Sequence, residues 1–178
     1  RALILRRVNL IQGGVGGLAA AVTAHFWETL GADAPTVVVV EPDTAACLLE
    51  SAVAGKTTTV GGDLETIMAG LACGEPSIIA WPILAGGASA FMAIPDSAAA
   101  EAMRLLASGA AGKTLVGGES GVAGLAGFLV AGELPTPLAA GLLLLTPLSF
   151  PVLMVRNATG PPDWLALAAG FLLMPTTL

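Results

Sequence analysis

The segment that most limits how this chain can fold is IQGGVGGLAAAV, residues 11–22. Four glycines in the five positions 13–17 follow a short apolar run and precede an alanine-rich stretch. A strand, a glycine turn and a helix in this order direct unpaired backbone N–H groups at one point, with the helix dipole behind them. Such a turn suits a phosphate group, because glycine has no Cβ atom to obstruct the approach.

Short apolar runs predict buried strands, and the segments between them predict helices. This alternation indicates an α/β fold, with a parallel sheet and helices on both faces in three layers. The composition agrees, because 55% of the residues are hydrophobic and 11% are charged, as in sheets covered on both sides. The predicted strands are Val8–Gln12, Thr36–Val40 and Ala90–Ile94, and the predicted helices are Leu18–Leu30, Thr44–Val53, Leu64–Ala72, Ser77–Leu84, Ser97–Ala107 and a small-residue helix within Gly117–Gly132.

The composition changes near residue 133. We expect an α/β domain over residues 1–133 and a tail over 134–178 that is rich in proline and leucine, with a candidate strand at Val152–Val155. Four prolines interrupt the uncharged stretch 134–155 and would break a spanning helix, so we expect no membrane segment. The chain begins with Arg rather than Met, which indicates a fragment.

Charge and cysteine content exclude several classes of partner. The net charge is −6 and the seven basic residues form no dense patch, so we expect no nucleic-acid binding and a small polar ligand instead. Cys47 and Cys73 are too few for a metal cluster, and buried thiols of a cytoplasmic protein are expected, with a disulfide as the alternative. The single histidine, His25, predicts no metal or catalytic site.

Acidic residues near the ends of the predicted strands have two readings. Asp43, Asp63 and Asp96 precede predicted helices and are expected to cap them. Glu41 lies at the distance expected for the ribose-binding acid of a dinucleotide site, and Gly14 and Gly16 fit the first half of its glycine pattern. From the residues alone, the glycine turn is therefore open between a nicotinamide cofactor and an isolated phosphomonoester.

Four segments in order resemble one enzyme family: QGGVGGLAAAVTAHFW, VVVEPDTAACLLESAVAGK, TVGGDLETIMAGLACGEPS and GGESGVAGLAG. They are similar to the C-terminal half of the diaminopropionate ammonia-lyases, within the tryptophan-synthase-β-like, fold-type II pyridoxal-phosphate enzymes. The resemblance implies an incomplete piece of that fold and elimination of ammonia from 2,3-diaminopropionate to give pyruvate. It also implies a cytoplasmic homodimer when complete. The cofactor would be pyridoxal 5'-phosphate, with the glycine turn holding its phosphate.

The resemblance also implies which residues bind the cofactor. In the family, the Schiff-base lysine and the acid/base carboxylates precede the glycine turn, so we expect no catalytic residue in this chain and no activity of the chain alone. Lys56 and Lys113 do not match that lysine. The expected cofactor-binding residues are Gly13, Gly14, Val15, Gly16 and Gly17 around the phosphate, Met68, Ala69, Gly70 and Glu119 along the ring, and Thr159 near the pyridine nitrogen.

Three departures from the family pattern limit the resemblance. Pro82 stands where a charged residue is usual and is expected to shorten or kink the Ser77–Leu84 helix. Cys47 replaces a carboxylate of a cation site that some relatives have beside Glu41 and Ala45, so we predict no metal there. The tail is unlike the family, which leaves a truncated product without function as an alternative to the enzyme.

Overall fold

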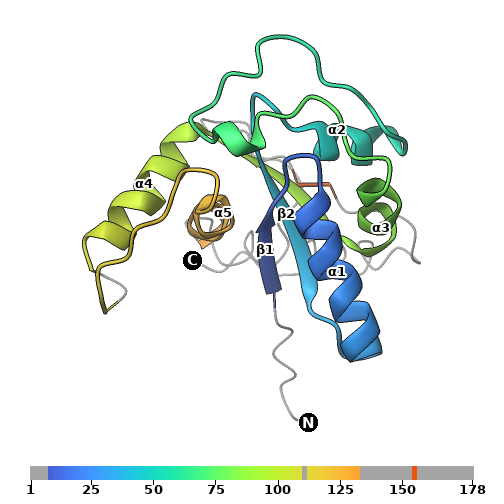
Figure 1. Cartoon of the computed structure of the whole chain (residues 1–178), viewed down its shortest axis with the longest axis horizontal. Coiled ribbons are helices and arrows are strands. Elements are labelled where there is room, and N and C mark those ends of the chain that lie inside the picture. The colour runs from blue at the N-terminus through green and yellow to red at the C-terminus, as the bar shows by residue number, and fades with distance from the viewer. Residues whose placement is uncertain (1–7, 110–111, 133–153, 156–178) are drawn as a thin grey trace, which may run out of the picture.

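A four-stranded sheet forms the centre of the computed structural model, which describes residues 8–109, 112–132 and 154–155. The strands stand in the order β1, β2, β3, β4, and the first three are parallel (Figure 1). The last pairs antiparallel with β3. All three predicted strands are confirmed, and the second runs two residues further. The bounds are β1 Val8–Gln12, β2 Thr36–Pro42, β3 Ala90–Ile94 and β4 Met154–Val155, the last inside the predicted run Val152–Val155.

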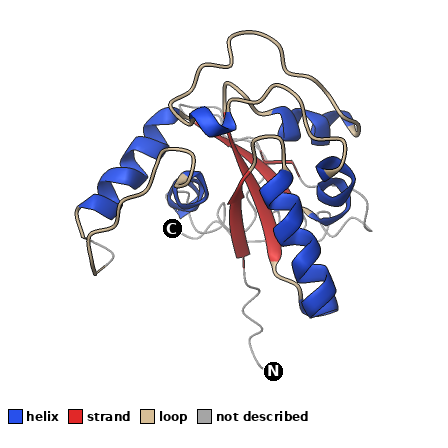
Figure 2. Cartoon of the chain, in the orientation of Figure 1, coloured by secondary structure: helices blue, strands red, loops and turns tan. Residues whose placement is uncertain are grey.

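Helices cover both faces of the sheet, as the alternating pattern predicts (Figure 2). Successive residues of β2 point to opposite faces. Val37 and Val39 pack with the helices α1, α2 and α3, whereas Val38 and Val40 pack with α4 and α5. The three-layer prediction is confirmed. The bounds are α1 Gly17–Leu30, α2 Cys47–Ala54, α3 Ala80–Gly87, α4 Asp96–Ala107 and α5 Ala123–Gly132, with short 3₁₀ turns η1 Gly31–Asp33 and η2 Ala69–Leu71.

Glycines let α5 lie directly on the sheet. A Cβ atom on Gly124 would collide with the carbonyl oxygen of Leu10 in β1. A Cβ atom on Gly127 would lie 2.9 Å from Cγ2 of Val40 in β2. The small-residue helix predicted within Gly117–Gly132 therefore forms, and its glycine spacing serves close packing.

The predicted helix Leu64–Ala72 is wrong. Only η2 is helical there, and the rest of residues 55–79 forms a long loop that arches over the carboxyl ends of the strands (Figure 1). Hydrogen bonds from residues distant in sequence fix the conformation of this loop. Thr44 Oγ1 donates to the carbonyl oxygen of Glu65 at 2.9 Å, and the Asp96 carboxylate accepts from Ile67 N at 2.9 Å. These contacts replace the local bonds that a helix would make.

Two helices begin three residues later than predicted. The α2 helix starts at Cys47 instead of Thr44, and α3 starts at Ala80 instead of Ser77 and runs on to Gly87. Pro82 therefore lies in the first turn of α3, where its missing N–H group leaves no helical bond unmade. Pro82 is expected from the sequence to shorten or kink the Ser77–Leu84 helix. The helix lacks residues 77–79 but is not shortened after Pro82, because it runs on to Gly87. Within the ranges 8–109 and 112–132, no helix combines the length and apolar character needed to cross a membrane.

Candidate functional site

The glycine turn joins β1 to α1 at the carboxyl end of the sheet (Figure 1). Gly13 N donates to the carbonyl oxygen of Val40 at 2.8 Å, and Gly16 N donates to that of Gly13 at 3.0 Å. The carbonyl oxygen of Val15 accepts from Ser77 N at 2.8 Å. Gly14 and Gly16 have φ angles of +58° and +96°, which side chains disfavour. These bonds fix the turn between β2 and the start of α3.

Three N–H groups of this turn are unpaired in the described residues. In the part of the chain that the structure describes, the N–H groups of Gly14, Val15 and Gly17 have no hydrogen-bond acceptor. They precede or begin the 14-residue helix α1, whose N-terminus carries partial positive charge. No atom lies within 4 Å of where a Cβ atom of Gly17 would be. The turn thus combines donors, dipole and room, the requirements of a phosphate site.

The glycines of the turn serve two different purposes. A Cβ atom on Gly13 would lie 2.7 Å from Glu41 Cγ, and one on Gly16 would lie 2.9 Å from Leu84 Cδ1. These two glycines are therefore required by packing within the protein. Gly17 has open space around it and no positive φ angle. Packing does not explain its lack of a side chain, and its place at the start of α1 makes it a candidate ligand-facing position.

The structure brings the other predicted ring-binding segments to the same place. A Cβ atom on Gly14 would lie 3.4 Å from the carbonyl oxygen of Gly70. Gly70 N donates to Ser120 Oγ at 2.9 Å, and Glu119 is exposed in the turn before α5. Met68 is fully buried, backbone included, in the core cluster that packs between the sheet and α5. Ala69 is exposed, and Thr159 lies outside the described residues.

Glu41 has a role that the sequence reading did not assign. Its fully buried carboxylate accepts from Leu48 N at 2.9 Å and from Leu49 N at 2.8 Å. Burial raises the pKa of Glu41 to about 8, although these N–H donors oppose the rise. The carboxylate is therefore unavailable to a ribose, and the nicotinamide alternative loses its acidic residue. The signal in the sequence is a carboxylate ending a buried run, which needs polar partners.

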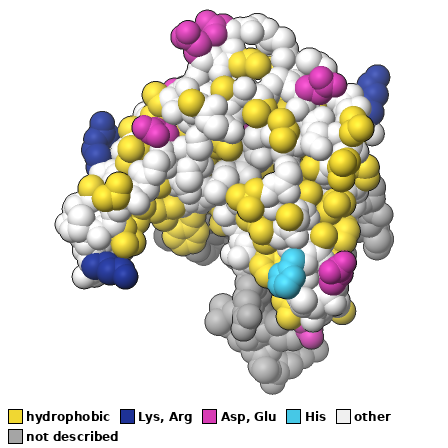
Figure 3. Space-filling view, in the orientation of Figure 1, with side chains coloured by type: hydrophobic (Ala, Val, Ile, Leu, Met, Phe, Trp, Pro, Cys, Tyr) yellow, Lys and Arg dark blue, Asp and Glu magenta, His cyan; other side chains and the backbone are white. Residues whose placement is uncertain are grey.

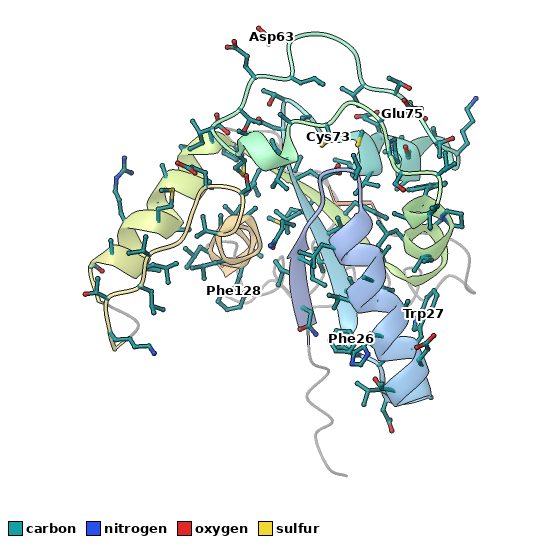
Figure 4. The ribbon with its side chains drawn as sticks, in the orientation of Figure 1. Phe26, Trp27, Asp63, Cys73, Glu75 and Phe128 are labelled. Carbon is teal, nitrogen blue, oxygen red and sulfur yellow. The ribbon has the colours of Figure 1, made fainter. Side chains whose placement is uncertain are left out.

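The three aspartates predicted as helix caps do other things. Asp63 accepts only from Glu65 N, at 3.3 Å, and lies high on the long loop (Figure 4). Asp43 is exposed and caps no helix, and burial together with the nearby Asp96 raises its pKa. Asp96 begins α4 but accepts from Thr66 Oγ1 and Ile67 N. The cap predictions fail because these carboxylates bond within the loop or across to it.

Both cysteines are free thiols near the glycine turn. Cys47 is buried and its Sγ donates to the carbonyl oxygen of Gly14 at 3.6 Å. Cys73 lies beside α2, above the turn (Figure 4). Burial, followed by the charge of Glu41, raises the pKa of Cys47 to about 12. The Cys47 thiol therefore stays protonated at neutral pH and is not a nucleophile there.

Apolar side chains gather on the surface over α1 and α3, beside the glycine turn (Figure 3). Ile78 and Ile79 are 82% and 77% exposed, and Leu18 is 53% exposed. Ser77, which bonds to the turn at Val15, connects them to it. Exposed apolar groups of this size mark surfaces that contact another molecule or another part of a protein.

Comparisons with known proteins identify relatives of this arrangement. A family model described as pyridoxal-phosphate dependent enzyme matches residues 7–144. A curated diaminopropionate ammonia-lyase of Salmonella typhimurium is 44% identical over 120 residues, covering 65% of this chain and 30% of that enzyme. The counterpart of Escherichia coli strain K12 is 42% identical over 117 residues, covering 65% of this chain and 29% of that enzyme. The chain thus spans less than a third of the length of these relatives.

Solved structures show the same similarity. Holo diaminopropionate ammonia-lyase from Escherichia coli superposes with a TM-score of 0.64 and 36% identity, covering 74% of this chain and 32% of that chain. A fungal L-serine ammonia-lyase from Rhizomucor miehei has a TM-score of 0.60 and 25% identity, covering 74% of this chain and 41% of that chain. The resemblance predicted from the four sequence segments is confirmed, and so is the predicted fold.

Proposed function

Because the chain belongs to the family of pyridoxal-phosphate-dependent enzymes, we propose that residues 1–133 form the part of an ammonia-lyase that holds its cofactor. The whole protein would eliminate ammonia from 2,3-diaminopropionate to give pyruvate. The observation that carries the proposal is the glycine turn, with free N–H groups at a helix N-terminus. The similarity to diaminopropionate ammonia-lyases supports the substrate.

The residues of the turn fit the phosphate of the cofactor. The N–H groups of Gly14, Val15 and Gly17 would donate to its oxygens, and the dipole of α1 would favour its charge. Gly13 and Gly16 would shape the turn, since packing leaves no room for a Cβ atom at either position. Bound pyridoxal phosphate supplies an electron sink, while the protein supplies binding and orientation.

A second group of residues would lie along the ring. Gly70 is next to Gly14, and Ser120 connects Gly70 to Glu119. We therefore keep Ala69, Gly70 and Glu119 as proposed ring contacts. Met68 stays proposed on the strength of the sequence resemblance alone. Thr159 stays the proposed contact of the pyridine nitrogen, on the strength of the sequence resemblance.

The phosphate-binding role is tested by replacing Gly17 with alanine. Because the new Cβ atom meets no protein atom, Gly17→Ala should leave the free energy of unfolding within about 0.5 kcal/mol of the original. It should weaken binding of pyridoxal phosphate and of inorganic phosphate by about tenfold or more. Isothermal titration calorimetry measures both affinities.

The matched control is Gly61→Ala, another glycine with open space and no positive φ angle, on the long loop. It should bind both ligands as the original chain does. Equal affinity of Gly17→Ala and the original chain for both ligands would remove the turn as the phosphate site.

The proposed reaction is tested on the protein encoded by the complete reading frame. With pyridoxal phosphate present, it should form pyruvate from 2,3-diaminopropionate faster than it forms pyruvate from serine or 2-oxobutyrate from threonine. Lactate dehydrogenase reduces both oxo acids, so one coupled assay measures all three rates. The 178-residue chain should form none, because its described lysines, Lys56 and Lys113, are exposed and do not match the reactive lysine. Pyruvate from serine alone, or 2-oxobutyrate from threonine alone, would contradict the proposed substrate.

Assembly and location complete the proposal. We expect the complete protein to be a homodimer in the cytoplasm. The exposed Ile78 and Ile79 support an apolar contact between parts or copies, and the free thiols of Cys47 and Cys73 support a reducing compartment. Light scattering coupled to size exclusion would measure the mass, and a monomer at micromolar concentration would contradict the dimer.

A further inference from the structure

Glu41 joins a strand, a helix and the glycine turn. It lies next to the end of β2 and is fully buried. The residue preceding α2, Ala46, makes no side-chain hydrogen bond to the helix. Glu41 caps α2 instead, although it lies outside the helix. Each of its carboxylate oxygens accepts a hydrogen bond from one of the first N–H groups of α2, those of Leu48 and Leu49.

The same side chain packs against the first half of the turn. The Cγ atom of Glu41 occupies the space that a Cβ atom on Gly13 would need, 2.7 Å away. Its neighbour Val40 accepts from Gly13 N at 2.8 Å. Cys47, at the start of the capped helix, donates to the carbonyl oxygen of Gly14. Contacts from β2 and α2 therefore converge on Gly13 and Gly14.

A capping role alone does not require this residue. Serine, threonine, aspartate or asparagine at the N-cap position would cap α2 locally, without burying a carboxylate, which is unfavourable unless its hydrogen bonds are made. Glu41 also reaches the turn, which a residue at position 46 need not do. Its geometry connects the free N–H groups of the turn to two elements of the core.

We propose that Glu41 is a positioning residue of the phosphate site, holding α2 and the glycine turn in the arrangement that leaves the N–H groups of Gly14 and Val15 unpaired within the protein. The proposal rests on the proposed phosphate-binding function. Glu41 touches no cofactor and acts through Gly13 and Gly14. No other acidic side chain in the described ranges is buried.

The test compares Glu41→Gln with Glu50→Gln. The first keeps the size of the side chain but places an NH₂ group against one of the two helix N–H groups. Glu50→Gln removes an exposed charge from α2, the helix that Glu41 caps. In the chain without ligand, Glu41→Gln should shift the ¹H–¹⁵N signals of Gly14 and Val15, and Glu50→Gln should leave them in place.

With ligand, Glu41→Gln should weaken binding of inorganic phosphate and pyridoxal phosphate by a similar factor, about tenfold, and shift the ³¹P signal of the bound phosphate. Glu41→Asp, which keeps the carboxyl group, should recover part of the affinity and serves as the folded variant if Glu41→Gln does not fold. Urea unfolding of each variant gives the fraction folded.

Unchanged turn signals in the folded variants would overturn the positioning role, even if the original chain bound no phosphate. Loss of affinity that follows the unfolded fraction alone would also overturn it. Failure of the original chain to bind phosphate, with shifted turn signals in Glu41→Gln, would instead remove the proposed function and leave Glu41 as a residue that orders an unused turn, contrary to the proposal.

Discussion

At the scale of single residues, Glu41 and Gly17 show two ways in which a site constrains a sequence. Glu41 is held by contacts on every side, with both oxygens bonded and Gly13 against its Cγ atom. Gly17 has no such neighbour, since nothing lies within 4 Å of where its Cβ atom would be. The first is fixed by contacts within the protein, and the second, on the proposed function, by the phosphate group that would bind there.

The raised pKa of Glu41 makes stability depend on pH. The pKa is about 8 in the folded chain against 4.5 for an unperturbed carboxyl group, so the folded state holds the proton more tightly. The resulting stabilisation is complete below about pH 4.5 and is lost as the pH rises through about 8. Urea unfolding across this window should show a decrease of a few kcal/mol in the free energy of unfolding.

In Glu41→Gln this pH dependence should flatten, because the titrating group is gone. Glu101→Gln, an exposed glutamate on α4, should keep the slope of the original chain. An equal slope in Glu41→Gln and Glu101→Gln would assign the pH dependence to another group.

At the scale of elements, α5 depends on a glycine that meets the sheet. Alanine in a helix is favoured over glycine by about 1 kcal/mol, but a Cβ atom on Gly124 would enter the carbonyl oxygen of Leu10. Gly124→Ala should therefore lower the free energy of unfolding by about 1–3 kcal/mol in urea titration. Gly121→Ala is the control, since its Cβ atom would lie 3.4 Å from the Gly118 carbonyl oxygen. A similar loss of stability in Gly121→Ala would show that the contact with Leu10 is not the cause.

The long loop over the sheet depends on Asp96. This carboxylate accepts from Thr66 Oγ1 and Ile67 N, so Asp96→Ala should release the loop locally. Amide hydrogen exchange at Ile67 should become about tenfold faster or more. Glu101→Ala on the same helix should leave it unchanged, and slow exchange in Asp96→Ala would show that other contacts hold the loop.

The same elements show what the sequence could predict. Strands β1 and β3 have the predicted bounds because their apolar runs are short and are followed by turn residues. The helix predicted at Leu64–Ala72 failed because its contacts come from Thr44 and Asp96, which are distant in sequence. The role of Glu41 was missed for the same reason, since its partners lie seven and eight residues away, on another element. Local pattern locates the glycine turn but not what supports it.

At the scale of the whole molecule, the two layers of helices pack on opposite faces of the same strands, β2 and β3. Leu48 is buried between the sheet and the α1–α3 layer, and Ile94 is buried on the opposite face. Because β2 belongs to both cores, we expect the layers to unfold together. If one layer of helices unfolded alone, the apolar face of β2 that it covers would be exposed to water.

Leu48→Ala and Ile94→Ala should each lower the free energy of unfolding by about 2–5 kcal/mol. In each variant, circular dichroism and tryptophan fluorescence should follow one coincident urea transition. Val53→Ala, at a valine of α2 that is 55% exposed, should change stability by about 0.5 kcal/mol at most. Two separate transitions would show that the layers are independent and would favour a degenerate product over a folded domain.

The strands are neighbours in the sheet in the order in which they are neighbours in the chain. During synthesis, β1 leaves the ribosome before β2, and β2 before β3. Each new strand finds its partner already made, and chains generally fold from the N-terminal end as they emerge. The growing sheet then exposes a fresh edge only until the next strand arrives, which shortens the time in which that edge can pair wrongly with another nascent chain.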